Sequence, residues 1–108
     1  MSGTGFTTGD RWGGLPVVRR ISEACPRNRV VITGVITSAE QVSLGGTPGY
    51  RCEIDDGTGV IAVLFLGRSS IPALIAGACC TVEGTAQKDR KGLVVWNPIY
   101  QLQSPVVS

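Results

Sequence analysis

Histidine is absent from the 108-residue chain, and this single absence excludes several kinds of active site. Without an imidazole, neither a Ser-His-Asp nor a Cys-His arrangement for nucleophilic catalysis can be assembled within the chain. Histidine-containing zinc sites and histidine general bases are excluded for the same reason. We therefore expect a protein that is not an enzyme and that needs no metal or other cofactor.

Long apolar runs and charge are also scarce. No apolar run approaches the roughly 20 residues that span a bilayer, so we expect no membrane association. The first residues lack a basic flank followed by an apolar stretch, so no secretory signal is predicted and a cytoplasmic location is expected. Charged residues make up 17% of the chain and hydrophobic residues 43%, a balance that favours one folded domain over disorder.

The four cysteines do not have the spacing of a metal site. They are Cys25, Cys52, Cys79 and Cys80, whereas zinc sites use pairs separated by two residues. The one close pair is adjacent, and neighbouring residues of a strand point to opposite faces. A disulfide is not expected in a reducing compartment. We interpret Cys52 and one of Cys79 or Cys80 as small core residues.

The chain before the first strand divides into two parts. The segment Met1–Leu15 is rich in glycine, threonine and serine and is predicted to be a flexible tail. The folded domain is predicted to span residues 16–108 and to open with a short helix at 16–25. Val17, Ile21 and Ala24 share one face of that helix. A proline at the start suits a first helical turn, and Pro26 ends the helix.

From residue 29 onward the pattern is that of strands. The first run, Arg29–Ala39, is rich in β-branched residues and has Gly34 at its middle, which predicts a bend or bulge. The later segments are strands at Tyr50–Asp55, Val60–Leu66, Cys79–Ala86, and Leu93–Trp96 with Ile99–Leu102, and a short helix at Arg68–Ala76. Turn residues between the second and third strands (DDGTG, Asp55–Gly59) predict a hairpin, with the two aspartates as turn formers and not as catalytic acids. Pro98 is expected to kink the last strand.

Three strands, a helix and two further strands form the order of a five-stranded OB-fold (oligonucleotide/oligosaccharide-binding) Greek-key barrel. We therefore predict an all-β fold, with the barrel at about residues 29–102, a short N-terminal helix, and a second helix between strands 3 and 4. Closure of such a barrel removes the sheet edges that β-branched strands would otherwise expose.

Several segments also resemble a known group of proteins. They are VVITGVITSAEQV, YRCEIDDGTGVIAVLFLG, a piece containing IPAL, CCTVEG and VVWNPIYQL. Together they resemble small bacterial, actinobacterial-type OB-fold nucleic-acid-binding domains, and more distantly the wedge domain of branch-migration helicases and anticodon-binding OB domains. The most specific piece is the DDGTG turn before an apolar strand. This resemblance implies binding of single-stranded DNA or RNA, or docking onto a nucleic-acid machine, and it implies no reaction.

Candidate binding residues follow from where such barrels hold their ligands, across strands 2 and 3 and between two flanking loops. The predicted nucleic-acid contacts are Arg51, Arg68, Lys88, Arg90, Lys91 and Trp96. The five cations have alternative readings: the three of the 88–91 loop as a solvated hairpin tip, Arg51 as a partner of Glu53, and Arg68 as the start of a helix. The acids Glu53 and Asp55 share the face of Arg51 and would repel phosphates.

Two further alternatives remain open at this point. Four arginines near the first helix (Arg19, Arg20, Arg27 and Arg29) could form a basic patch away from the usual groove. The strand Val60–Leu66 is apolar on both faces, so its outer face could dock a protein partner or a second copy of the chain. A net charge of +2 permits a polyanionic partner without requiring one.

Overall fold

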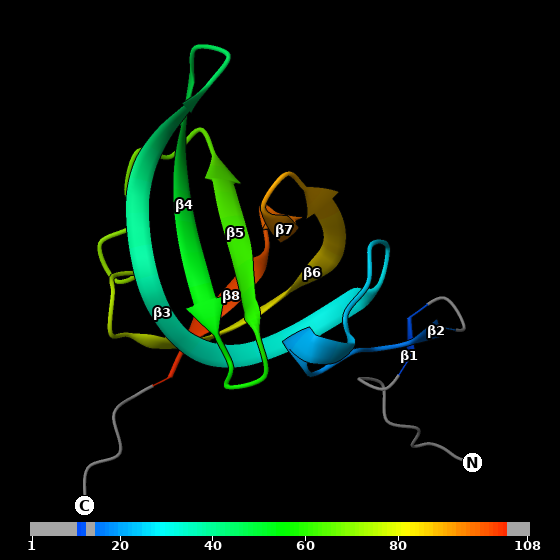
Figure 1. Ribbon diagram of the computed structural model, residues 1–108. Helices are drawn as coiled ribbons and strands as arrows, with labels where there is room; N and C mark the ends of the chain where they lie inside the picture. The colour runs from blue at the N-terminus through cyan, green and yellow to red at the C-terminus, as the bar shows by residue number, and fades with distance from the viewer. Residues whose placement is uncertain (1–10, 13–14, 104–108) are drawn as a thin grey trace, which may run out of the picture.

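Strands make up nearly all of the regular structure in the computed structural model, which describes residues 11–12 and 15–103 (Figure 1). Two short strands, β1 (Arg11–Trp12) and β2 (Leu15–Pro16), pair antiparallel ahead of the barrel. The predicted flexible tail, Met1–Leu15, lies mostly outside the described residues. No helix in the described part of the chain is long and apolar enough to cross a membrane.

Six strands form the barrel. They are β3 (Arg29–Leu44), β4 (Thr47–Asp55), β5 (Val60–Leu66), β6 (Cys79–Asp89), β7 (Gly92–Trp96) and β8 (Ile99–Leu102). Their order in the sheet is β3-β4-β5-β7-β6-β8, and a further pairing of β3 with β6 closes the barrel. The β5–β7 pair is parallel and the other pairs are antiparallel. This is the predicted Greek-key order, with the last strand divided into β7 and β8 by Asn97 and Pro98.

Gly34 lies where β3 changes partners, as its position in the run predicts. Residues up to Val35 pair with β6, and residues from Val35 onward pair with β4. A Cβ atom at Gly34 would stand 2.5 Å from the carbonyl oxygen of Asp55, so only glycine lets the two backbones approach this closely. The bend is reinforced by a register shift between Ile36 and Ser38. One long strand therefore serves both halves of the barrel (Figure 1).

The barrel interior is filled by the inward-facing aliphatic residues of every strand from β3 to β7. Tyr50 and Phe65 are buried, and the Tyr50 hydroxyl donates to the carbonyl oxygen of Leu74 at 2.6 Å. Cys52 and Cys80 are buried core residues, whereas Cys79 is exposed. Burial, with a smaller effect of neighbouring Cys80, raises the pKa of the Cys52 thiol to about 11, which suits a packing residue and not a reactive one.

The predicted N-terminal helix at 16–25 is wrong. The structure has only a single 3₁₀ turn, Ile21–Glu23, and an extended segment before it. Val18 is held there by β3, because its N–H donates to Arg29 O and its carbonyl oxygen accepts from Val31 N–H, both at 2.9 Å. A helix of this length gains little without tertiary support, and here the backbone contacts of Val18 favour the extended form.

The predicted helix at Arg68–Ala76 is also wrong. That segment consists of tight turns, with Leu74 N–H donating to Ile71 O at 2.9 Å and Ala78 N–H to Ile75 O at 3.0 Å. Ile71 and Leu74 are buried against the barrel, and the carbonyl of Leu74 is already occupied by Tyr50. Pro72 supplies no N–H to a helix. The apolar residues therefore close one end of the barrel as a plug of turns.

Two hairpins reach further than the sequence predicts. Residues 43–49, which lie between the predicted strands Arg29–Ala39 and Tyr50–Asp55, belong to β3 and β4 apart from a turn at Gly45–Gly46. Residues 87–92, expected to be a charged turn, lie in β6 and β7 apart from a turn at Arg90–Lys91. The backbones continue to pair through both hairpins, so both ladders extend beyond the apolar segments that predicted the strands.

Candidate nucleic-acid interface

Arg51, Leu64 and Trp96 form one row across the outer face of the barrel. Arg51 on β4 is the register partner of Leu64 on β5, and Leu64 is in turn the partner of Trp96 on β7. Two of the predicted contacts are therefore brought onto one face, about 10 Å apart by the spacing of neighbouring strands. Trp96 is 39% exposed, so part of its surface on this face is open to solvent.

The centre of this outer face is apolar and is covered by the chain itself. Leu64 is only 5% exposed and packs with Ala62 and Val94, and Val42 and Leu44 from the β3–β4 hairpin lie against this cluster. Exposed apolar side chains remain at the two ends of β5, at Val60 and Leu66. The broad apolar docking face considered for this strand is thus already filled at its middle.

Arg51 has a carboxylate partner on its own strand. Its guanidinium donates to the carboxylate of Glu53 at 2.8 Å, and its side chain is only 16% exposed. This is the alternative pairing that the sequence left open. Glu40 of β3 stands opposite Arg51, and Asp55 follows on the same face of β4. The charge of Arg51 is therefore balanced locally, and the β4 side of the face carries more acid than base.

Lys88, Arg90 and Lys91 lie together at the end of the β6–β7 hairpin. All three are exposed, and none forms an ion pair within the described residues. Asp89 stands between them, and its carboxylate accepts the N–H of Arg90 at 2.7 Å. Arg90 and Lys91 occupy the turn, and both are exposed to solvent.

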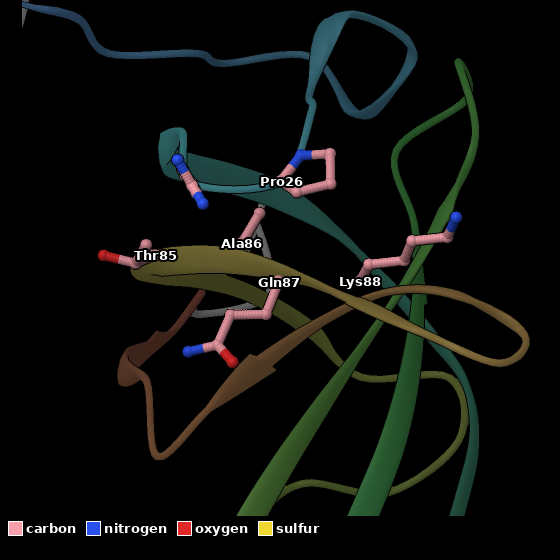
Figure 2. A pocket seen from close by; sticks show the side chains of 6 residues that line it. Pro26, Thr85, Ala86, Gln87 and Lys88 are labelled. Atoms are coloured by element: carbon pink, nitrogen blue, oxygen red, sulfur yellow. The ribbon is translucent and has the colours of Figure 1, made fainter.

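Arg27 joins this hairpin although the sequence separates the two by some sixty residues. Its N–H donates to Ala86 O at 2.7 Å, and Ala86 N–H donates to Asn28 O at 2.8 Å, so the loop 25–28 lies against β6. Arg27, Pro26 and Lys88 line the same open hollow (Figure 2). The sequence suggested Arg27 for a patch away from the groove, and only the backbone pairing reveals its place. We call Arg27, Lys88, Arg90 and Lys91 the basic end.

The other arginines do not belong to the basic end. Arg68 is exposed just after β5, near the β3–β4 hairpin, because Gly67 N–H donates to Pro48 O at 2.8 Å. Arg29 pairs with Glu83 at 3.0 Å, and Arg20 with Glu23 at 3.9 Å. Of the four arginines near the first predicted helix, at least these two have acidic neighbours.

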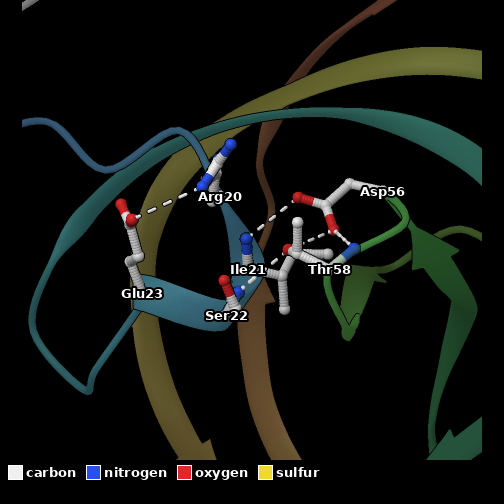
Figure 3. A network of polar contacts seen from close by, with 6 residues as sticks. All are labelled: Arg20, Ile21, Ser22, Glu23, Asp56 and Thr58. Carbon is white, nitrogen blue, oxygen red and sulfur yellow. Dashed lines mark hydrogen bonds and ion pairs between the residues drawn. The ribbon is translucent and has the colours of Figure 1, made fainter.

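The two aspartates of the DDGTG turn have structural partners. Asp55 accepts the N–H of Gly57 at 2.7 Å, and Asp56 accepts the N–H of Thr58 at 2.8 Å, as expected for turn formers. Asp56 also accepts the N–H of Ile21 at 2.9 Å, which ties the 3₁₀ turn to the barrel (Figure 3). Burial opposes ionisation of this carboxyl, but hydrogen bonds from Thr58, Ile21 and Gly59 outweigh it and lower its pKa.

Comparison with solved structures gives OB-fold neighbours. The second OB-fold domain of replication protein A from Methanococcus maripaludis aligns at 19% identity over 85% of this chain and 99% of that chain, with a TM-score of 0.58. The OB domain of Ta0387 from Thermoplasma acidophilum aligns at 16% identity over 85% and 91%, with a TM-score of 0.60. A structure of yeast Stn1 and Ten1 aligns at 12% identity over 71% of this chain and 43% of that chain, with a TM-score of 0.57.

At these identities the likeness establishes the fold, an all-β OB barrel, and leaves the ligand open. No family model matches the sequence, and no curated protein matches it. The assignment of a ligand therefore depends on the side chains of the barrel surface.

Proposed function

We propose that this chain is a non-catalytic module that binds single-stranded DNA or RNA with little sequence preference, and that the strand enters at the basic end. The observation that carries this proposal is the gathering of Arg27, Lys88, Arg90 and Lys91, four cations against the single carboxylate of Asp89. The neighbours include an OB domain of a replication protein, which supports the same class of ligand.

The path of the strand follows from charge and exposure. Phosphates are attracted to the basic end and repelled by the β4 side, where Glu40, Glu53 and Asp55 outnumber Arg51. Trp96 lies on β7, the strand that leaves the basic hairpin, and offers one exposed aromatic surface for a base. We infer a short site along β7, with weak affinity, because it contains one stacking residue and a few phosphate contacts. Arg51 and Arg68 make smaller contributions in this arrangement.

The proposal is tested with labelled single-stranded oligonucleotides, DNA and RNA, titrated with protein and followed by fluorescence anisotropy at several salt concentrations. The logarithm of the binding constant should fall with the logarithm of salt by about 0.7 per phosphate contact, so three or four contacts give a slope of about −2 to −3. The double substitution Arg90→Ala/Lys91→Ala should make that slope shallower by about 1.4.

A matched control is available in Arg19→Ala/Arg20→Ala, which removes two neighbouring exposed arginines elsewhere on the surface. It changes the net charge by the same amount but leaves the basic end intact. Equal effects of the two double substitutions would mean that net charge alone attracts the strand and that the basic end is not the site. Absence of binding at low salt would overturn the proposal as a whole.

A further inference from the structure

A hollow of about 290 Å³ lies at the end of the barrel, between the loop 25–28 and β6 (Figure 2). Pro26, Arg27 and Lys88 are among its lining residues, together with Thr85, Ala86 and Gln87. It is close to the lower end of the volume range of small-ligand sites, which begins at about 300 Å³. The hollow is therefore of a size for one nucleotide, not for a longer segment.

The walls of the hollow are fixed by backbone contacts. Both backbone groups of Ala86 are hydrogen-bonded to the loop, its carbonyl to Arg27 N–H and its N–H to Asn28 O. Cys25 N–H donates to the Asn28 side-chain oxygen at 2.7 Å, and Asn28 N–H returns to Cys25 O at 3.1 Å. These bonds hold Arg27 at a φ of 79°, a conformation that non-glycine residues adopt only when their surroundings impose it.

The pairing of β6 also orients a backbone donor toward the loop. The N–H and the carbonyl oxygen of Ala86 are both bonded to the loop. In the antiparallel β6–β7 ladder, Ala86 and Val95 are therefore a pair that exchanges no backbone hydrogen bonds. Such pairs alternate with hydrogen-bonded pairs along the ladder, so Lys88 and Leu93, two residues further on, also exchange no backbone hydrogen bonds. The N–H of Lys88 therefore points to the loop side of the strand, beyond the last residue that the loop covers.

The wall chemistry suits a nucleotide. The side chains of Arg27 and Lys88 and the N–H of Lys88 are donors for a phosphate, and the exposed ring of Pro26 is an apolar surface for a base. Figure 2 shows Pro26 on the loop side of β6, whereas the side chain of Gln87 extends from the opposite side of the strand. We propose that this hollow holds one nucleotide of the bound strand, with its phosphate at the Arg27 side chain and the Lys88 N–H and its base against Pro26.

This proposal rests on the proposed function, and the test separates the two. Anisotropy titrations with a thymidine oligonucleotide are made on the unmodified chain and on Arg27→Gly, Pro26→Ala and, as a control, Gln101→Ala at an exposed position of β8 that does not line the hollow. Glycine at position 27 removes the side chain while accepting a positive φ without strain, so the loop keeps its shape. We expect Arg27→Gly to weaken binding about fivefold at 0.1 M salt, the effect of losing one phosphate contact, and Gln101→Ala to leave it unchanged.

A second measurement locates the nucleotide. Thymidine 5′-monophosphate, thymidine and inorganic phosphate are each added to ¹⁵N-labelled protein, and amide shifts are recorded by NMR. The monophosphate should shift the amides of Arg27 and Lys88 more than either part alone, and it should not do so in Arg27→Gly. If the oligonucleotide binds and both Arg27→Gly and Pro26→Ala bind like the unmodified chain, the hollow is not a subsite although the proposed function stands. If the oligonucleotide does not bind the unmodified chain, the proposed function and this subsite are both wrong.

Discussion

The carboxylate of Asp56 accepts a hydrogen bond from the backbone N–H of Ile21, 35 residues earlier in the chain, at 2.9 Å. Its other oxygen accepts from Thr58 and Gly59 within the turn. One side chain therefore shapes the β4–β5 turn and also fastens the segment before the barrel, where Ile21 is buried. Gly59 allows this approach, because a Cβ atom there would stand 2.9 Å from the Ile21 side chain.

Asp56→Asn should therefore destabilise the fold. Asparagine keeps one acceptor oxygen but replaces the other with an amide that cannot accept the Ile21 N–H. We expect the free energy of unfolding in urea to fall by about 1.5–3 kcal/mol, the range for hydrogen bonds to charged groups. Asp55→Asn is the control, because among the described residues that carboxylate accepts a single hydrogen bond, from Gly57 in the exposed turn, and we expect a loss under about 1 kcal/mol. Equal losses would assign no special role to the Ile21 contact.

The same carboxylate predicts a pH dependence of stability. Its pKa in the folded state lies below the ordinary value of 3.8, so the unfolded chain binds the proton more readily. The stabilisation is then complete well above pH 4 and is lost as pH falls from about 4 through the folded pKa. Urea unfolding at pH 7, 5 and 3 should show a decline confined to the acid side. Asp56→Asn should reduce that decline, and an unchanged acid slope in the variant would contradict the assignment.

Gly34→Ala should destabilise the barrel at the point where β3 changes partners. The new methyl group would meet the carbonyl oxygen of Asp55 at 2.5 Å and the side chain of Ile54 at 2.9 Å, so a backbone must shift. Overpacking of this kind costs about 1–3 kcal/mol, measured as a lower midpoint of thermal or urea unfolding. Ser38→Ala, at an exposed position further along the same strand, should change the midpoint little. A Gly34→Ala protein as stable as Ser38→Ala would show that the bend tolerates a side chain.

The strands could be predicted from the sequence because they depend on local patterns. The alternation of Tyr50, Cys52 and Ile54, the β-branched run with Gly34 at its middle, and the break at Pro98 each mark a strand feature without reference to the rest of the chain. The two predicted helices failed for the opposite reason. The backbone of Val18 is taken by β3, and the carbonyl of Leu74 is taken by Tyr50. Neither contact has a signal in the local sequence.

The candidate site could also be predicted only where its residues are neighbours in the sequence. Lys88, Arg90 and Lys91 are neighbours in the sequence, so their grouping needs no tertiary information. Arg27 reaches them only through the hydrogen bonds between its loop and Ala86, and a cation next to a proline gives no hint of that pairing. The ion pair between Arg51 and Glu53 was one of the alternatives that the sequence offered, because the two residues lie two positions apart on the same face of one strand.

The cysteines should divide into two reactive and two protected thiols. Cys25 and Cys79 are exposed, whereas burial raises the pKa values of Cys52, to about 11, and of Cys80. With a pKa of about 11, only about 0.1% of a thiol is ionised at pH 8, and the thiolate is the form that reacts. A disulfide-exchange reagent at pH 8 should therefore label two thiols quickly and all four after denaturation. Four thiols reacting at one rate in the folded protein would contradict the core positions of Cys52 and Cys80.

Trp96 should report directly on a bound strand. Trp96 is 39% exposed on β7 and is the register partner of Leu64 on the outer face, so a base can stack on it without disturbing the core. Trp96→Ala should weaken binding of a single-stranded oligonucleotide by about 1–3 kcal/mol, or about 5- to 150-fold, whereas Trp96→Phe should retain most of the affinity. In a Trp12→Phe background, where Trp96 is the one tryptophan left, its fluorescence should be quenched on binding. Unchanged affinity in Trp96→Ala, with no quenching, would move the path of the bases away from β7 and leave the phosphate contacts of the basic end as the whole of the interaction.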